Sequence, residues 1–138
     1  MEKLLYVDDD VEIQGLIKDI LSKEGFGITV AKDGQEALRL VKADKFDLIL
    51  LDYLMPGLNG DQVCASLKDD AQTADIPVIM VTAYPNEKER ALAAGAVDFI
   101  EKPIEKIDLL LRIRSALKVR HIKNELQKII AYLEELEK

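Results

Sequence analysis

The sequence predicts a single α/β domain built on a parallel sheet that is covered by helices on both faces. Strand-like and helix-like segments alternate five times along the 138 residues, and this alternation requires right-handed crossovers between parallel strands. One strand-like run, residues 46–51, is apolar nearly throughout, which is typical of a strand with both faces buried. A chain of this length is long enough to bury a real core.

The expected strands are short apolar runs bounded by polar residues or turn residues. They cover residues 4–7, 28–31, 46–51, 78–81 and 97–101. Pro77 opens the fourth of them. Four of the five run directly into residues that carry chemistry, namely Asp8-Asp9-Asp10, Asp52, Thr82 and Lys102-Pro103.

Helix boundaries are predicted from capping residues. Asp10 and Asp33 stand where an N-cap is expected, before the first two helices. Gly25 and Gly95 stand where a C-cap glycine is expected. The first helix carries an apolar stripe of Val11, Ile13, Leu16, Ile17, Ile20 and Leu21.

The second half of the chain adds three further expectations. Asn86 with Glu89 three residues later predicts a capping box for the fourth helix. Gly57 and Gly60, in the loop after the third strand, are interpreted as turn glycines. The last helix is expected to begin near Ile104.

Residues 120–138 are predicted to extend this last helix as a coiled-coil linker, since neither glycine nor proline interrupts them. A heptad seam spaced 3, 4, 3, 4, 3 runs along the extension, which predicts a homodimer through this helix. The alternative is a long final helix whose distal part frays. The seam consists of Val119, Ile122, Leu126, Ile129, Leu133 and Leu136.

Composition narrows the class of protein. The net charge of −7 argues against direct nucleic-acid binding, which needs a basic patch. No run reaches the roughly 20 apolar residues of a membrane span, and no signal segment opens the chain. A single cysteine, Cys64, cannot form an internal disulfide, so the expected location is the cytoplasm. Cys64 is expected to be a buried structural thiol and His121 a solvated helix residue.

The polar residues that follow the strands predict a functional site. Ligands of open parallel sheets bind in the crevice at the carboxyl ends of the strands. Several carboxylates cannot share such a crevice in ionised form without a cation. Oxygen ligands with open positions suit Mg²⁺, which also bridges to phosphate. We therefore expect a site for a divalent cation and a phosphoryl group.

At these residues the chain resembles the receiver domain of two-component response regulators. The resemblance rests on four motifs in register, and it covers about residues 3 to 120. The motifs are Val7-Asp8-Asp9-Asp10, Leu50 to Gly60, Val81-Thr82-Ala83 and Asp98 to Pro103. It implies a flavodoxin-like (βα)5 three-layer sandwich with strand order 2-1-3-4-5, a receiver domain at 1–119 and an extended last helix.

The resemblance also assigns roles to site residues. Asp52 is the expected phosphoacceptor, with Thr82 and Lys102 contacting phosphoryl oxygens. The expected cofactor is Mg²⁺, with Mn²⁺ as an alternative. Its protein ligands would be Asp8, Asp9, Asp52 and the backbone carbonyl of Leu54, with Asp8 acting mainly through a water. The bond between Lys102 and Pro103 is a candidate for the cis form.

The family is a two-state switch, and the resemblance identifies its moving parts here. Thr82 is expected to move toward the phosphoryl group, while Phe99 on the fifth strand turns inward behind it. Many members carry tyrosine at the position of Phe99, so this switch is expected to depend on packing. Leu54 and Tyr84 occupy positions that tune access of water to the aspartyl phosphate, and their bulk predicts slow dephosphorylation.

These expectations describe a signalling switch that catalyses its own phosphorylation and dephosphorylation and is not otherwise an enzyme. The implied partner is a sensor histidine kinase or phosphotransfer protein. Two alternatives stay open for the output: a stand-alone regulator, or a longer protein in which the last helix leads to an output domain. Two other functions fit parts of the sequence. One is a small phosphatase with an aspartyl nucleophile, although Leu54 stands where its second acid belongs. The other is a coiled-coil oligomerisation module with a relic site.

Overall fold

The computed structural model describes residues 1–138, apart from the side chain of Pro85, and contains one five-stranded parallel sheet. The predicted strand order, β2-β1-β3-β4-β5, is confirmed. The strands are β1 (Lys3–Val7), β2 (Gly27–Ala31), β3 (Leu48–Asp52), β4 (Val78–Thr82) and β5 (Asp98–Glu101). β1 pairs with both β2 and β3, so the ends of β1 and β3 lie side by side.

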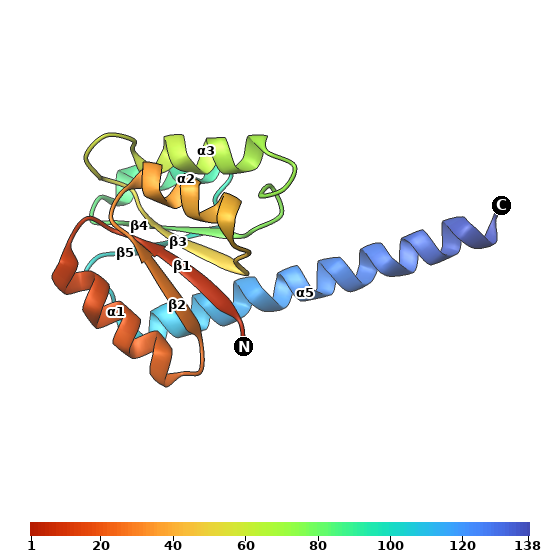
Figure 1. Cartoon of the computed structure of the whole chain (residues 1–138), viewed down its shortest axis with the longest axis horizontal. Helices are drawn as coiled ribbons and strands as arrows, with labels where there is room; N and C mark the ends of the chain where they lie inside the picture. Colours follow the sequence, from red (N-terminus) through yellow and green to blue (C-terminus); the bar gives the residue numbers. More distant parts are fainter.

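Helices cover both faces of the sheet and complete the expected three layers (Figure 1). On one face, α2 (Gly34–Ala43), α3 (Gly60–Asp69) and the short α4 (Lys88–Ala93) pack over the sheet. On the other face lie α1 (Val11–Lys23) and the first part of α5 (Lys106–Leu136). Strand residues alternate between these two layers, as Leu4 and Leu5 illustrate.

The capping predictions for the first two helices are confirmed. Asp10 accepts hydrogen bonds from the backbone amides of Glu12 and Ile13 at the start of α1. Asp33 accepts one from the amide of Glu36 at the start of α2. Gly25 and Gly95 both have positive φ, as C-terminal cap glycines require.

The capping box predicted at Asn86 and Glu89 is wrong. The chain first forms a 3₁₀ turn at Pro85–Glu87, and α4 begins only at Lys88. The Glu87 side chain contacts the end of β4, as described below, and no side chain caps α4. A side-chain contact at a helix start that was not predicted occurs instead at α3, where the amide of Asn59 donates to Gln62 at 2.9 Å.

α5 is the longest element and begins at Lys106, two residues after the expected start. Its first turns are held on the sheet by four buried residues, Leu109, Leu110, Ile113 and Leu117. Beyond them the helix projects away from the rest of the molecule and ends near the C-terminus (Figure 1). No helix in the described part of the chain combines the length and apolar character needed to cross a membrane.

Candidate functional site

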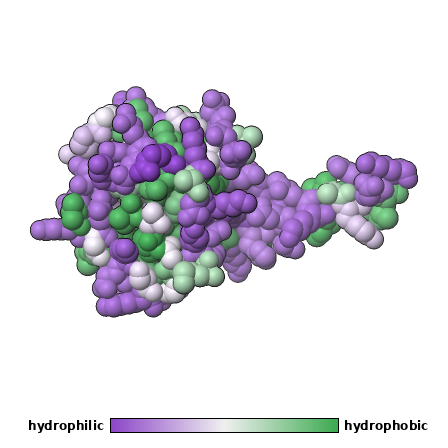
Figure 2. Space-filling model, viewed as in Figure 1, coloured by the Kyte–Doolittle hydropathy of each residue, from purple (hydrophilic) through white to green (hydrophobic). Residues whose placement is uncertain are grey.

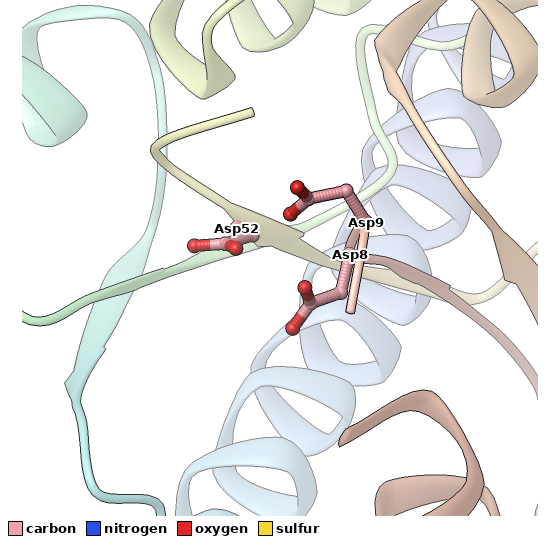
Figure 3. A group of neighbouring side chains, drawn as sticks. All are labelled: Asp8, Asp9 and Asp52. Carbon is pink, nitrogen blue, oxygen red and sulfur yellow. The ribbon is translucent and has the colours of Figure 1, made fainter. Parts of the chain in front are cut away.

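Three carboxylates meet at the carboxyl ends of β1 and β3. Asp8 and Asp9 directly follow β1, and Asp52 is the last residue of β3. One oxygen from each lies within 4.8 Å of the others (Figure 3). The two strands are neighbours in register, with Val7 opposite Leu51, so the backbone itself sets this convergence.

Asp8 is fully buried and held by two hydrogen bonds. The Tyr6 hydroxyl donates to its Oδ2 atom at 2.6 Å, and the backbone amide of Asp10 donates to its Oδ1 atom at 2.9 Å. Burial, together with the hydrogen bond to Asp8, raises the pKa of the Tyr6 hydroxyl, which therefore remains a proton donor. Asp9, by contrast, is exposed and free to reach a ligand from the solvent side.

Asp52 is 4% exposed, and its surroundings oppose its ionisation. Burial raises the pKa of this carboxyl from 3.8 to about 6, the Lys102 charge offsets part of the rise, and nearby Asp8 adds to it. A divalent cation among the three carboxylates would supply the missing counter-charge. The oxygen-only donor set is the kind that Mg²⁺ and Mn²⁺ prefer.

Lys102 brings a cation to the same place from the loop after β5. Its Nζ atom lies 3.2 Å from Oδ2 of Asp52, and its backbone amide donates to the carbonyl of Thr82. The peptide bond between Lys102 and Pro103 is cis. The amine therefore belongs to a loop that is tied to the end of the neighbouring strand.

Thr82 ends β4 and is buried, but its hydroxyl is engaged away from the carboxylates. Oγ1 donates to Oε2 of Glu87 at 2.8 Å and accepts from the backbone amide of Tyr84 at 3.0 Å. Sequence reasoning missed Glu87, because an acid five residues after a strand end carries no periodic or motif signal. The structure thus places a fourth carboxylate near the crevice, bound to a hydroxyl.

The expected switch residue Phe99 lies on β5 and is half-buried against the layer of α2, α3 and α4. The ammonium of Lys88, the first residue of α4, lies 4.9 Å from the centre of its ring. The side chains of Leu54 and Tyr84 are both about half exposed on the loops that follow β3 and β4.

The loop after β3 depends on two glycines for different reasons. Gly57 has φ of +81°, so its interpretation as a turn glycine is confirmed. Gly60 is needed for space, because a Cβ there would lie 2.7 Å from both the backbone oxygen of Asp52 and Sδ of Met80. The first turn of α3 can therefore pack directly on the end of the strand that carries Asp52.

The remaining candidates lie outside this crevice. Cys64 is buried in α3, and burial raises the pKa of its thiol, in agreement with a structural role. His121 is exposed on α5, as expected. The six seam residues of α5 are each more than half exposed, and hydrophobic atoms gather near the far end of the projecting helix (Figure 2).

The chain belongs to the response regulator receiver domain family, whose model matches residues 4–114. It is 45% identical over 123 residues to the transcriptional regulatory protein CpxR of Klebsiella pneumoniae. It is 39% identical over 127 residues to the response regulator PleD of Caulobacter vibrioides. A CheY-like receiver domain structure from Methanospirillum hungatei superposes with a TM-score of 0.84 at 30% identity, covering 89% of this chain and 98% of that one.

The chain spans only part of these curated relatives. The match to CpxR covers 88% of this chain and 51% of that protein, and the match to PleD covers 91% and 28%. Two-component signalling is therefore the class of function that the comparisons establish, because what they share is the receiver domain.

Proposed function

We propose that the protein accepts a phosphoryl group on Asp52 and thereby switches a signalling output. The observation that carries this proposal is the joint placement of three carboxylates within 4.8 Å and of Lys102 at 3.2 Å from Asp52. A nucleophilic carboxylate, a cation site and a fixed amine are the parts that phosphoryl transfer to an aspartate needs. On this proposal Asp52 is a phosphoacceptor, and the only reactions that the protein catalyses are its own phosphorylation and dephosphorylation.

Asp8, Asp9 and Asp52, with the backbone carbonyl of Leu54, are the proposed ligands of Mg²⁺. When bound, the cation would supply positive charge that offsets the carboxylates and the phosphoryl oxygens. Asp8 is already held by Tyr6 and by a backbone amide, so it is oriented before any ligand arrives. The raised pKa of Asp52 supports this assignment, because an ionised Asp52 needs an added positive charge.

In the proposed transfer, an Asp52 oxygen attacks phosphorus and forms an acyl–phosphate bond. The bond from phosphorus to the donor breaks, and its electron pair leaves with the donor imidazole or carboxylate. Lys102 turns from Asp52 to an oxygen of the transferred group, and the Thr82 hydroxyl donates to another. These residues position the phosphoryl group and stabilise the negative charge on its oxygens. The two effects supply most of the catalysis in phosphoryl transfer.

The proposed donor is a histidine kinase or phosphotransfer protein, which agrees with the family and with the cytoplasmic location expected from the sequence. Hydrolysis of the aspartyl phosphate is expected to be slow. Leu54 and Tyr84 place bulky side chains on the two loops beside the site, where they restrict the approach of water.

A matched pair of variants tests the proposal. Intact mass after incubation with Mg²⁺ and acetyl phosphate should show one added phosphoryl group, and Asp52→Asn should abolish it. Asp75→Asn makes the same chemical change at an exposed position and should leave the adduct unchanged. Rapid turnover of p-nitrophenyl phosphate without an adduct would contradict the proposal and indicate a phosphatase.

We also propose that residues 1–119 form the receiver domain and that 120–138 form a coiled-coil linker toward an output domain. The occupant proposed for the exposed seam is a second copy of this chain. The seam is self-complementary in its 3,4 spacing, and each large side chain left in water forgoes about 1.5–3 kcal/mol. Phosphorylation of Asp52 is then expected to change the pairing or register of the two helices.

Light scattering in the presence of Mg²⁺, before and after a phosphoryl donor is added, tests the dimer. A dimer in both states would indicate that the signal is a change of register. A mass that changes with phosphorylation would show that the site controls assembly. A monomer in both states would contradict the proposed dimer.

A further inference from the structure

The switch residues Thr82 and Phe99 are both held by consecutive residues at the start of α4. Glu87 accepts the hydrogen bond of the Thr82 hydroxyl at 2.8 Å. Lys88 places its ammonium 4.9 Å from the centre of the Phe99 ring. The two residues with proposed switching roles thus contact one dipeptide that carries opposite charges.

The contact at Thr82 excludes the proposed contact with phosphate, because a hydroxyl has only one proton to donate. That proton is directed at Glu87, and the lone pairs receive the backbone amide of Tyr84. Thr82 is 2% exposed, so water cannot easily replace Glu87 as its partner. The hydroxyl must therefore break from Glu87 before it can donate to a phosphoryl oxygen.

The contact at Phe99 also opposes the switch, but it does so through a cation–π attraction and not through a hydrogen bond. A cation over the face of an aromatic ring is attracted by the negative charge of that face. Phe99 has no hydroxyl with which to anchor itself in either state, so this attraction acts directly on the orientation of the ring. A ring that turns inward would lose its contact with Lys88.

Resting on the proposed function, we propose that Glu87 and Lys88 form a two-point latch that holds the unphosphorylated state. Glu87 is a positioning residue that competes with the phosphoryl group for the Thr82 hydroxyl, and Lys88 holds the Phe99 ring in the orientation that it has in this structure. Glu87 is the last residue of the 3₁₀ turn at Pro85–Glu87, and Lys88 is the first residue of α4. Release of both contacts would free the start of α4 to move, which links the chemistry at Asp52 to the surface of that helix.

The first experiment measures the rate of Asp52 phosphorylation by acetyl phosphate in the full chain with Mg²⁺. Glu87→Ala should accelerate it about three- to tenfold, the equivalent of losing one net hydrogen bond. Glu89→Ala removes the same charge from an exposed position two residues further on, in α4, and should stay within about twofold of the unaltered protein. Equal rates for Glu87→Ala and the unaltered protein would overturn the latch.

Two further variants separate a latch from a general effect of charge. Glu87→Gln keeps an oxygen acceptor and should recover most of the slow rate, whereas a pure charge effect would make it equal to Glu87→Ala. In a Thr82→Ala background, Glu87→Ala should have no effect, because the two residues act as one unit. A full acceleration in that background would also overturn the latch.

The contact at Phe99 is read directly by fluorine NMR. The chain has three phenylalanines, so 4-fluorophenylalanine gives three signals, and Phe99→Leu identifies the one that matters. Lys88→Met keeps the aliphatic stem and should shift that signal toward its position in the phosphorylated protein. An unchanged signal would remove Lys88 from the latch. If the unaltered protein forms no adduct, the proposed function and the latch are both overturned. If the adduct forms normally but Glu87→Ala is phosphorylated at the same rate as the unaltered protein, only the latch is overturned.

Discussion

Replacing Asp52 by asparagine should stabilise the metal-free protein at neutral pH. In the folded chain the pKa of Asp52 rises from 3.8 to about 6 because the carboxyl is buried, with Lys102 offsetting part of the rise and Asp8 adding to it. The side chain is only 5% exposed, so solvent screening is small. At neutral pH, folding therefore moves an ionised carboxylate from water into surroundings that disfavour its charge.

The size of the effect follows from that pKa. A rise from 3.8 to about 6 corresponds to about 3 kcal/mol of lost stability at pH 7.5, where the carboxyl is ionised in both states. Asparagine removes this charge, and its amide nitrogen can donate to Asp8. It also weakens the pair with Lys102, whose side chain is 32% exposed, so a gain of about 1–3 kcal/mol is expected.

The pH dependence has a definite sign. Between pH 3.8 and about 6 the folded state binds more protons at Asp52 than the unfolded state does, so lowering the pH through this window restores stability. Asp52→Asn lacks this gain. Its advantage over the unaltered protein should therefore be largest above pH 7 and should shrink toward pH 4.

Urea unfolding followed by circular dichroism, with a chelator and at one protein concentration, measures both quantities. Asp75→Asn is the matched control and should change the free energy of unfolding by less than about 0.5 kcal/mol. Added Mg²⁺ should stabilise the unaltered protein more than Asp52→Asn, because only the former keeps all three carboxylates. Equal stability of Asp52→Asn and the unaltered protein at pH 7.5, or a difference independent of pH, would refute the reasoning.

Three other substitutions test other parts of the molecule. Lys102→Met should slow phosphorylation by acetyl phosphate about 100-fold by intact mass, and a rate within threefold of the unaltered protein would contradict its role. Gly60→Ala should lower the free energy of unfolding in urea by about 2 kcal/mol, because its Cβ would lie 2.7 Å from a backbone oxygen. Gly15→Ala is the control: it adds a Cβ in open space on a helix and should raise the free energy of unfolding by about 0.5–1 kcal/mol. Leu126→Lys should dissociate the proposed dimer in light scattering, whereas Gln127→Lys should not. Loss of the dimer in both variants would show that the dimer does not depend specifically on the seam.

The strands and the polar residues that follow them could be predicted because both depend on local sequence, whereas the strand order was implied by the resemblance to receiver domains. Four of the five strands end at, or just before, a polar residue of the site, and parallel strands bring such ends to one edge of the sheet. Asp10 and Asp33 cap their helices through bonds to amides two or three residues away, which are equally local. The identification of Asp8, Asp9 and Asp52 as one group needed only the order of two strands in addition.

Predictions that depended on contacts across the fold were less successful. Asn86 and Glu89 have the spacing of a capping box, but the chain at this point forms a 3₁₀ turn. Gly60 carries no positive φ, and its importance appears only when the backbone of the third strand is placed beside it. In each case the deciding neighbour belongs to another element, and no spacing within one segment can indicate it.

The attachment of α5 determines how a change at the site could reach its distal end. Arg112 pairs with Asp98 on β5 at 2.7 Å, and Arg120 donates to the carbonyl of Asp47 before β3 at 2.8 Å. These contacts hold the helix at β5 and at the residue before β3, and its distal part projects from the domain (Figure 1). A continuous helix without glycine or proline lacks the usual causes of a sharp kink, so we expect a shift of β5 to move the distal part as one body. On this reasoning, a small rotation about the Arg120 contact would produce a larger displacement along the projecting turns, where the seam residues lie.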